Sequence, residues 1–172
     1  MEVALVIGHT RFRKGAYSPR LMQYEYDFYK RYEHILKTLG DVFYHNPYTT
    51  SYTKRQKAMA KKTKNYDLVF ELHFNSSDGT AAGCEALYYF KNNKTRVLSE
   101  KFCREYSVLS NARNRGAKEL HKPSQRGYGF VYYQKPNAII LEPFFGDNLI
   151  DVQKFDITNF IEALRRTIPC ED

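Results

Sequence analysis

Two histidines and one glutamate stand at the ends of three largely apolar runs in this sequence. The runs are Val3–His9, Leu68–His73 and Ala138–Glu142. Runs of this length and composition predict strands that are buried on both faces of a sheet. Because open α/β sheets bind ligands beyond the carboxyl ends of their strands, we expect the three polar side chains to share one site. Imidazole and carboxylate groups together favour zinc at that site.

Glu25 adds a fourth candidate from a helix. At about 100° per residue, it falls within the arc of apolar residues on the helix that is expected to end at Leu39. A carboxylate on the buried face of a helix is costly unless a cationic group meets it, which favours a metal ligand. The alternative is that Glu25 lies in the first turn and gains only from the helix dipole.

The strand-end residues also have ordinary structural explanations. His9 and His73 could be histidines satisfied by local hydrogen bonds, and Glu142 could pair with one of the many arginines. However, the alternation of a strand places Glu71, His73 and Asn75 on one side, opposite an apolar side. Three polar residues on one side near the end of a strand are hard to explain as core. The ordinary explanations would require four separate coincidences.

This set of residues suits hydrolysis of an amide. His9, Glu25 and His73 would hold zinc and leave a fourth position for water, whose pKa the metal lowers to about 7. Glu142 is then free to act as general base and to pass the proton to the leaving nitrogen. No nucleophilic serine or cysteine is needed. The sequence contains no G-x-S-x-G, H-E-x-x-H, phosphate-binding or dinucleotide-binding motif.

Length, charge and cysteine usage indicate one basic domain. The chain has 172 residues, and 27 Lys and Arg against 19 Asp and Glu give a net charge of +8. Such a charge favours nucleic acid, anionic lipid or an anionic wall polymer as partner. Cys84, Cys103 and Cys170 are widely spaced and form no C-x-x-C, so reduced thiols and folding in a cytoplasm are expected. Neither a signal peptide nor a transmembrane run is recognisable.

Strands and helices alternate along the chain. Strands are expected at about 3–9, 41–45, 67–74, 84–90, 129–133 and 138–142, and helices from between 18 and 25 to 39, then at about 51–64, 94–110 and 151–168. The stretch 111–128 is expected to be a long functional loop with room for a short strand. This alternation predicts a single α/β domain over residues 1–172.

Six short motifs follow one another in a specific order. They are Val-Ile-Gly-His at 6–9, Glu25 at a helix start, Glu-Leu-His-Phe-Asn at 71–75, Gly-Cys-Glu-Ala-Leu-Tyr-Tyr at 83–89, Asn-Arg-Gly at 114–116 and Leu-Glu-Pro-Phe-Phe at 141–145. Together they resemble the zinc-dependent N-acetylmuramoyl-L-alanine amidases of the Amidase_3 type. Each motif alone is weak, but their order and spacing over nearly the whole chain are specific.

The resemblance implies a twisted, mixed, mostly parallel sheet flanked by helices. It also implies cleavage of the amide between N-acetylmuramic acid and L-alanine in peptidoglycan, with His9, Glu25 and His73 as zinc ligands and Glu142 as the catalytic glutamate. The chain departs from the family pattern at Glu71, where many members have serine. There a carboxylate would be a partner for an imidazole N–H. Pro143-Phe144-Phe145 replaces a Gly-Phe continuation, so a different substrate groove is expected.

Two basic segments are candidates for contact with an anionic partner. The first lies in the helix at 51–64 and consists of Lys54, Arg55, Lys57, Lys61, Lys62 and Lys64. It is either a solvated face or a surface attracted to the anionic cell envelope. The second lies in the stretch 111–128 and includes Arg113, Arg115, Lys118, Lys122 and Arg126. Guanidinium pairs well with carboxylate, so Arg115, together with Asn75, is a candidate for substrate contact.

Three functions remain open at this stage. The first is a zinc amidase that lyses bacterial walls as a phage or prophage endolysin. Such a protein is expected to be a monomer, to be made in the host cytoplasm before release, and to bind peptidoglycan rather than nucleic acid. The second is a zinc peptidase or carboxypeptidase on wall peptides. The third is a non-catalytic binder of wall polymer or nucleic acid, which would leave Glu25 and the strand-end residues unexplained.

Overall fold

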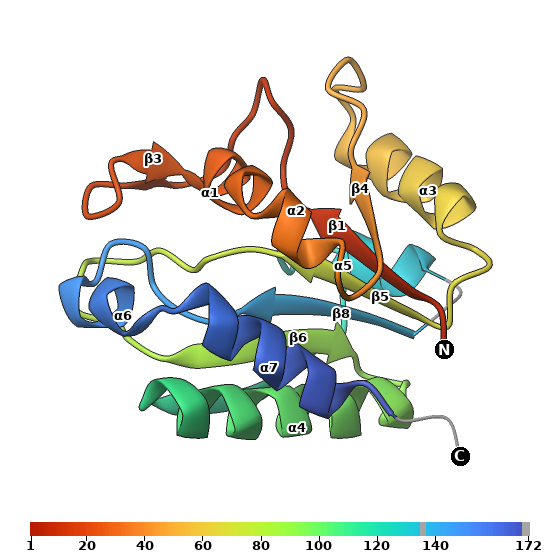
Figure 1. The fold of residues 1–172 in the computed structure, drawn as a ribbon. Coiled ribbons are helices and arrows are strands. Elements are labelled where there is room, and N and C mark those ends of the chain that lie inside the picture. Colours follow the sequence, from red (N-terminus) through yellow and green to blue (C-terminus); the bar gives the residue numbers. More distant parts are fainter. Residues whose placement is uncertain (135–136, 170–172) are drawn as a thin grey trace.

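One six-stranded sheet forms the centre of the computed structural model, which describes residues 1–134 and 137–169 (Figure 1). Its strands, in spatial order, are β4 (Asp41–Tyr44), β1 (Val3–Ile7), β5 (Leu68–Leu72), β8 (Asn137–Glu142), β6 (Cys84–Tyr89) and β7 (Asn114–Leu120). Neighbouring strands pair in parallel, except that β6 and β8 are antiparallel. The prediction of a mixed and mostly parallel sheet is therefore confirmed.

The strands that precede the predicted site residues end at one edge of this sheet. Ile7 of β1 lies opposite Leu72 of β5, and Leu72 lies opposite Leu141 of β8. Every residue of β1 and β5 is buried, as expected for continuous apolar runs that are covered on both faces. Because the three strands run in parallel and in register, the polar residues that end or follow them meet at the same place.

Helices cover both faces of the sheet (Figure 1). One face packs against α1 (Glu25–Arg31), α2 (Glu33–Leu36), α4 (Asn93–Ser110) and α7 (Ile157–Thr167). The other face packs against α3 (Tyr52–Lys62) and α5 (Tyr128–Tyr133). The short helix α6 (Leu149–Lys154) precedes α7, and a small hairpin of β2 (Tyr17–Ser18) and β3 (Gln23–Tyr24) precedes α1.

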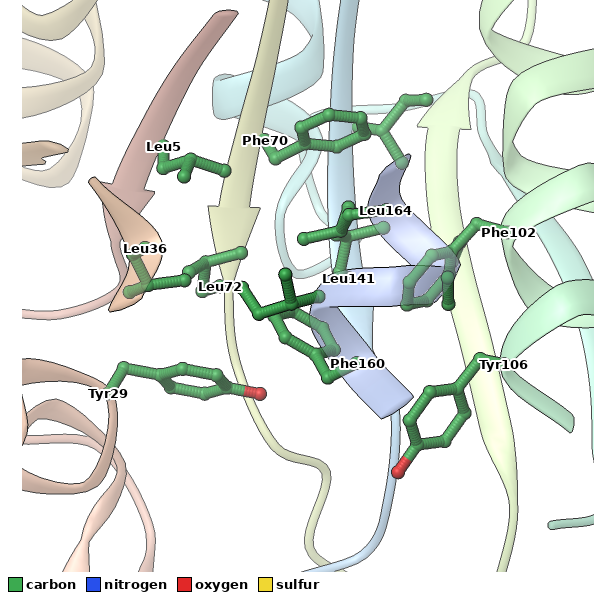
Figure 2. Packing of buried hydrophobic residues seen from close by; sticks show 14 of the residues in the cluster. Leu5, Tyr29, Leu36, Phe70, Leu72, Phe102, Tyr106, Leu141, Phe160 and Leu164 are labelled. Atoms are coloured by element: carbon green, nitrogen blue, oxygen red, sulfur yellow. The ribbon is translucent and has the colours of Figure 1, made fainter. Parts of the chain in front are cut away.

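Aromatic packing fixes α1 against the sheet and the C-terminal helix. Phe160 of α7 is fully buried, and its ring centroid lies 6.2 Å from that of Tyr29 in α1 and 5.9 Å from that of Phe102 in α4 (Figure 2). The contact with Phe102 is edge-to-face and that with Tyr29 is tilted, and such ring contacts add to the stabilisation that burial of each ring provides. The helix that carries Glu25 is thus anchored by the main core.

Two expected helices are divided in the structure. The helix expected to end at 39 begins at Glu25, the latest start considered, and is interrupted at Tyr32 between α1 and α2. The helix expected at 151–168 is split into α6 and α7. Phe155 is extended there, and the Asp156 carboxylate accepts the Thr158 N–H at 2.6 Å as a new helix cap.

The region 111–133 was predicted least well. The strand expected at 129–133 is wrong, because this segment forms the helix α5. It begins after Gly127, which has a φ of 83°, and it buries Phe130 and Val131 against α3. The expected loop contains the seven-residue strand β7, which pairs along the full length of β6. Its polar sequence is explained by its position at the sheet edge, where much of it is exposed.

Cys84 and Cys103 are buried free thiols, as expected, whereas Cys170 lies outside the described residues. Within the described part of the chain, no helix is both long enough and apolar enough to cross a bilayer.

A buried carboxylate fastens the C-terminal segment to the sheet. Asp151 in α6 is 4% exposed, and its Oδ2 atom accepts the N–H of Gly83 at 2.7 Å and the N–H of Phe145 at 2.9 Å. These two N–H groups precede β6 and follow β8, respectively. The single carboxylate therefore joins two neighbouring strands to the helix that leads into α7.

We predict that Asp151→Ala lowers the free energy of unfolding by about 3 kcal/mol, because two buried N–H groups lose their acceptor. Urea denaturation measures this change. The control Glu162→Ala removes a carboxylate paired with Arg166 within a helix, and it should change stability by less than about 0.5 kcal/mol. Equal effects of the two substitutions would contradict the role given to Asp151.

Candidate metal centre and active site

The backbone leaves β1 in a conformation that brings the first histidine over the sheet edge. Gly8 continues the sheet pairing, since its N–H donates to the carbonyl of Leu72 at 3.1 Å. His9 then has a φ of 66°, in the left-handed region that residues with a side chain rarely adopt. Strained residues of this kind gather at functional sites, and His9 is one of the predicted metal ligands.

Three donor groups meet at this edge. His9 Nε2 lies 2.9 Å from Glu25 Oε2 and 3.1 Å from His73 Nδ1, and His73 Nδ1 lies 3.3 Å from Glu25 Oε1. Among the described residues, these three side chains form a group that could hold a metal ion. The structure therefore brings together one residue after β1, one after β5 and one from the first turn of α1.

Two glycines make room for this group. A Cβ atom on Gly8 would lie 2.5 Å from Cε1 of His73. A Cβ atom on Gly15, whose φ is 84°, would lie 2.2 Å from Glu25 Oε2 and 2.5 Å from His9 Nε2. All three distances are far inside van der Waals contact, so a side chain at either position would displace the donor groups. The close approach requires glycine at both positions.

Glu25 is ionised although it is buried. Only 2% of the residue is exposed, and its Oε2 atom also accepts the N–H of Ala16 at 2.6 Å. Burial alone would raise the pKa of the Glu25 carboxyl, but the hydrogen bonds from His73 and His9 outweigh it and lower that pKa to about 2. Glu25 lies in the first turn of its helix and is buried, so its position agrees with the structural part of both explanations; its role as a metal ligand stays a prediction.

The opposite side of the His73 ring faces a second buried carboxylate. His73 Nε2 lies 3.3 Å from Glu71 Oε2, and Glu71 Oε1 lies 2.7 Å from Nε2 of His45. Burial opposes charge on both His73 and Glu71. The adjacent opposite charges nevertheless raise the pKa of His73 to about 10 and hold the pKa of Glu71 well below its usual value. Glu71 therefore lies between the rings of His73 and His45, close to an imidazole nitrogen of each.

His45 was not identified from the sequence. It follows β4, which lies next to β1 in the sheet, and it is 5% exposed. The available signal was the same as for His9 and His73, namely a histidine at the end of a short strand. The expected strand at 41–45 is less apolar than the three runs that end at His9, His73 and Glu142. The pattern therefore did not mark His45 as a site residue.

Glu142 belongs to a separate hydrogen-bonded chain of side chains. Asn75 Nδ2 donates to Glu142 Oε2 at 2.8 Å and to Glu85 Oε1 at 2.7 Å. Arg115 Nε donates to Glu85 Oε2 at 2.7 Å, and its guanidinium lies 5.0 Å from the ring centroid of Phe145. Asn75 thus contacts Glu142 directly, and Glu85 connects Asn75 to Arg115. Glu85 is buried, and the sequence did not identify it as a site residue.

The pKa of Glu142 moves in the opposite direction from that of Glu25. Burial is the largest cause of its rise to about 7; the charge of His73 opposes this rise and the neighbouring Glu85 adds to it. Glu85 and Glu142 lie directly opposite each other in the antiparallel pair of β6 and β8. A carboxyl with this pKa can both accept and donate a proton near neutral pH, as a general acid–base catalyst must.

A cavity of about 390 Å³ opens beside the donor group. Its lining combines His9, His73 and Glu142 with His45, Glu71, Tyr52, Arg55, Gln56, Leu87, Ile140 and the segment 123–127. The site therefore offers three metal-type donors, a titratable carboxyl and adjoining space for a ligand at one sheet edge.

The sequence profile of a family described as N-acetylmuramoyl-L-alanine amidase, Amidase_3, matches residues 3–168. No curated protein matches the chain.

Solved structures share the fold over nearly their whole length. The catalytic domain of the CD27L endolysin, described as targeting Clostridia difficile, has a TM-score of 0.71 at 23% identity, covering 98% of this chain and 99% of that one. An N-acetylmuramoyl-L-alanine amidase from Clostridium difficile 630 has a TM-score of 0.71 at 20% identity, covering 96% and 92%. The amidase CwlV from Bacillus (Paenibacillus) polymyxa has a TM-score of 0.70 at 17% identity over its catalytic domain, covering 97% and 96%. These likenesses show the fold.

We predict that Glu85→Gln lowers the pKa of Glu142 in the metal-free protein from about 7. The substitution removes a negative charge beside Glu142, so its ionised form is less disfavoured. NMR measures the change from the carboxyl chemical shifts of Glu142 between pH 4 and 9. This range extends about two pH units or more on each side of the pKa.

Glu119→Gln is the matched control, because Glu119 is an exposed carboxylate on the neighbouring strand β7. The Glu119→Gln substitution should leave the pKa of Glu142 unchanged. An unchanged or raised Glu142 pKa in Glu85→Gln would refute the coupling between the two carboxyls.

Proposed function

The chain belongs to the Amidase_3 family of N-acetylmuramoyl-L-alanine amidases, and on this basis we propose that it is a zinc-dependent peptidoglycan hydrolase. In this proposal His9, Glu25 and His73 hold the zinc ion, and Glu142 is the catalytic carboxylate. The bond that is cleaved joins N-acetylmuramic acid to L-alanine in the bacterial cell wall. The convergence of His9, Glu25 and His73 within 4.8 Å of one another, next to Glu142, carries the proposal.

The spacing of the three donors fits zinc. In tetrahedral coordination with bonds of about 2.0–2.1 Å, donor atoms lie about 3.3 Å from one another. His9 Nε2 and His73 Nδ1 lie 3.1 Å apart; Glu25 Oε2 lies 2.9 Å from the first of these atoms and Glu25 Oε1 lies 3.3 Å from the second. Two imidazoles and one carboxylate are also a donor set of catalytic zinc sites. A zinc ion would also neutralise the buried charge of Glu25, which the imidazoles of His9 and His73 stabilise in this structure.

When bound, zinc would acidify a water molecule and polarise the scissile carbonyl group. The chain's own residues supply the proton transfers. Glu142 in its ionised form accepts a proton from the attacking water, and the resulting carboxylic acid donates it to the nitrogen of L-alanine as the C–N bond breaks. Asn75 orients Glu142 through its 2.8 Å hydrogen bond. Ionised Glu142 is required at the first step, so activity should rise as pH increases through the pKa of this group.

A lytic function of the endolysin type is part of the proposal. It is supported by the fold shared with an endolysin catalytic domain over 98% of this chain and by the net charge of +8, which favours approach to anionic cell envelopes. Turbidity loss of bacterial cells after external addition of the protein tests this part independently of the bond specificity.

We predict that the zinc-loaded protein releases new L-alanine amino termini from purified peptidoglycan. Mass spectrometry should find glycan freed from complete stem peptides, whereas cleavage inside the stem would indicate a peptidase instead. Glu142→Gln should reduce the rate at least about 100-fold, the loss expected for a general acid–base catalyst, and should retain one equivalent of zinc. His73→Ala should lose the zinc. Zinc content of His73→Ala equal to that of the wild type would refute the ligand assignment.

We predict that Glu71→Gln weakens zinc binding by roughly 10- to 100-fold, the usual cost of losing a carboxylate partner of a ligand histidine. The carboxylate of Glu71 orients the His73 ring and increases its basicity through the contact at Nε2. Competition with a fluorescent chelator measures the affinity directly. The exposed Glu119→Gln variant should bind zinc as the wild type does. Equal affinities for Glu71→Gln and Glu119→Gln would rule out this contribution of Glu71.

A further inference from the structure

The cavity beside the donor group contains features that the hydrolytic step does not use. It extends from His9, His73 and Glu142 to side chains of α3 and to the segment 123–127, and its volume is about 390 Å³. We propose that this cavity binds the acidic stem peptide of the substrate and that Arg126 pairs with a peptide carboxylate. The inference rests on the proposed function and identifies which half of the substrate occupies the cavity.

Arg126 is a free cation in the cavity lining. It is exposed, and it makes neither a hydrogen bond nor an ion pair with any residue in the described ranges 1–134 and 137–169. In contrast, Arg115 is held by Glu85 at 2.7 Å and is absent from the lining. Of these two arginines, Arg126 is the one with an unused guanidinium beside the site. A planar guanidinium pairs with a carboxylate through two parallel hydrogen bonds.

Polar atoms without partners lie in the cavity wall. His45 and Gln56 are 5% and 3% exposed, and both line the cavity. The Nδ1 atom of His45, the Oε1 atom of Gln56 and the Nε atom of Arg55 have no hydrogen-bond partner among the described residues. Buried polar groups are almost always hydrogen-bonded in folded proteins. Each of these three atoms is buried from solvent, so a bound peptide reaches them only if the side chains shift, and the pairing proposed for Arg126 does not depend on them.

The charge of the lining distinguishes the two halves of the substrate. Arg55 and Arg126 are permanent cations. The lining also contains two acidic residues: Glu71 is already paired with two imidazoles, and Glu142, which is bonded to Asn75, is the proposed catalytic carboxyl. Near the scissile bond the glycan is neutral, because its lactyl carboxyl forms the amide. The stem peptide carries free carboxylates. Leu87 and Ile140 add an apolar wall that suits the methyl group of L-alanine. These features favour the stem peptide as the occupant.

A pair of product peptides tests the inference by binding alone. They are L-Ala-γ-D-Glu-L-Lys, which has a free glutamate α-carboxylate, and L-Ala-D-isoGln-L-Lys, in which that group is an amide. Calorimetry with the zinc-loaded wild type should show at least about tenfold tighter binding of the acid, as expected for one charge-assisted hydrogen bond. Arg126→Gln should abolish this preference while zinc content stays the same.

Two further variants locate the binding site. Arg165→Gln removes an exposed arginine on α7, which packs on the opposite face of the sheet, and it should keep the full preference for the acid. Gln56→Leu fills a similar volume without the polar atoms, and it should weaken binding of both peptides alike. Equal binding of the two peptides to the wild type, or a preference that survives in Arg126→Gln, would overturn the inference.

Turnover separates this inference from the proposed function. With N-acetylmuramoyl tripeptides of the same two kinds, Arg126→Gln should raise KM for the acid about tenfold or more and leave kcat nearly unchanged. Hydrolysis of both substrates with equal KM by the wild type would overturn the inference but support the amidase assignment. No hydrolysis of either substrate, with zinc bound, would overturn the amidase assignment, and the peptide-binding measurements would still decide what the cavity holds.

Discussion

The contact between the buried carboxylate of Glu25 and the two imidazoles of His9 and His73 is the constraint on which the rest of this structure depends. A carboxylate that is 2% exposed is stable only with cationic or hydrogen-bonding partners on every side. The distances of 2.9 and 3.3 Å to the imidazoles satisfy this requirement. Because the Glu25 carboxylate and the His9 ring also lie close to Gly15, a side chain has no room at that position.

The pKa values of two carboxyl groups at this edge are shifted in opposite directions, although burial raises both. Glu25 has imidazoles beside both oxygens, which lower its pKa to about 2. Glu142 has a carboxyl neighbour and the neutral amide of Asn75, and its pKa rises to about 7. Environments that separate the pKa values of nearby acids are typical of sites that assign them different tasks. The proposed division between a metal ligand and a proton carrier follows from this difference.

The sheet provides the rigid support for both groups. Parallel strands in register bring His9 and His73 together, and the antiparallel β6 places Glu85 opposite Glu142. The mixed character of the sheet thus has a chemical consequence: Glu85 on the antiparallel strand β6 raises the pKa of Glu142 on β8. On the face covered by α3 and α5, the same edge opens into the cavity.

The sequence by itself determined the sheet class, the strand ends and the candidates His9, Glu25, His73 and Glu142, because apolar runs and helical periodicity are local signals of burial. It did not reveal the helix α5, the strand β7, the residues His45 and Glu85, or the free guanidinium of Arg126. Aromatic residues of α5 favour a strand locally and become helical only through packing against α3. The partners of His45 and Glu85 lie far away in the sequence, and Arg126 has no partner among the described residues. Only the tertiary structure therefore decided which charges are paired and which remain available.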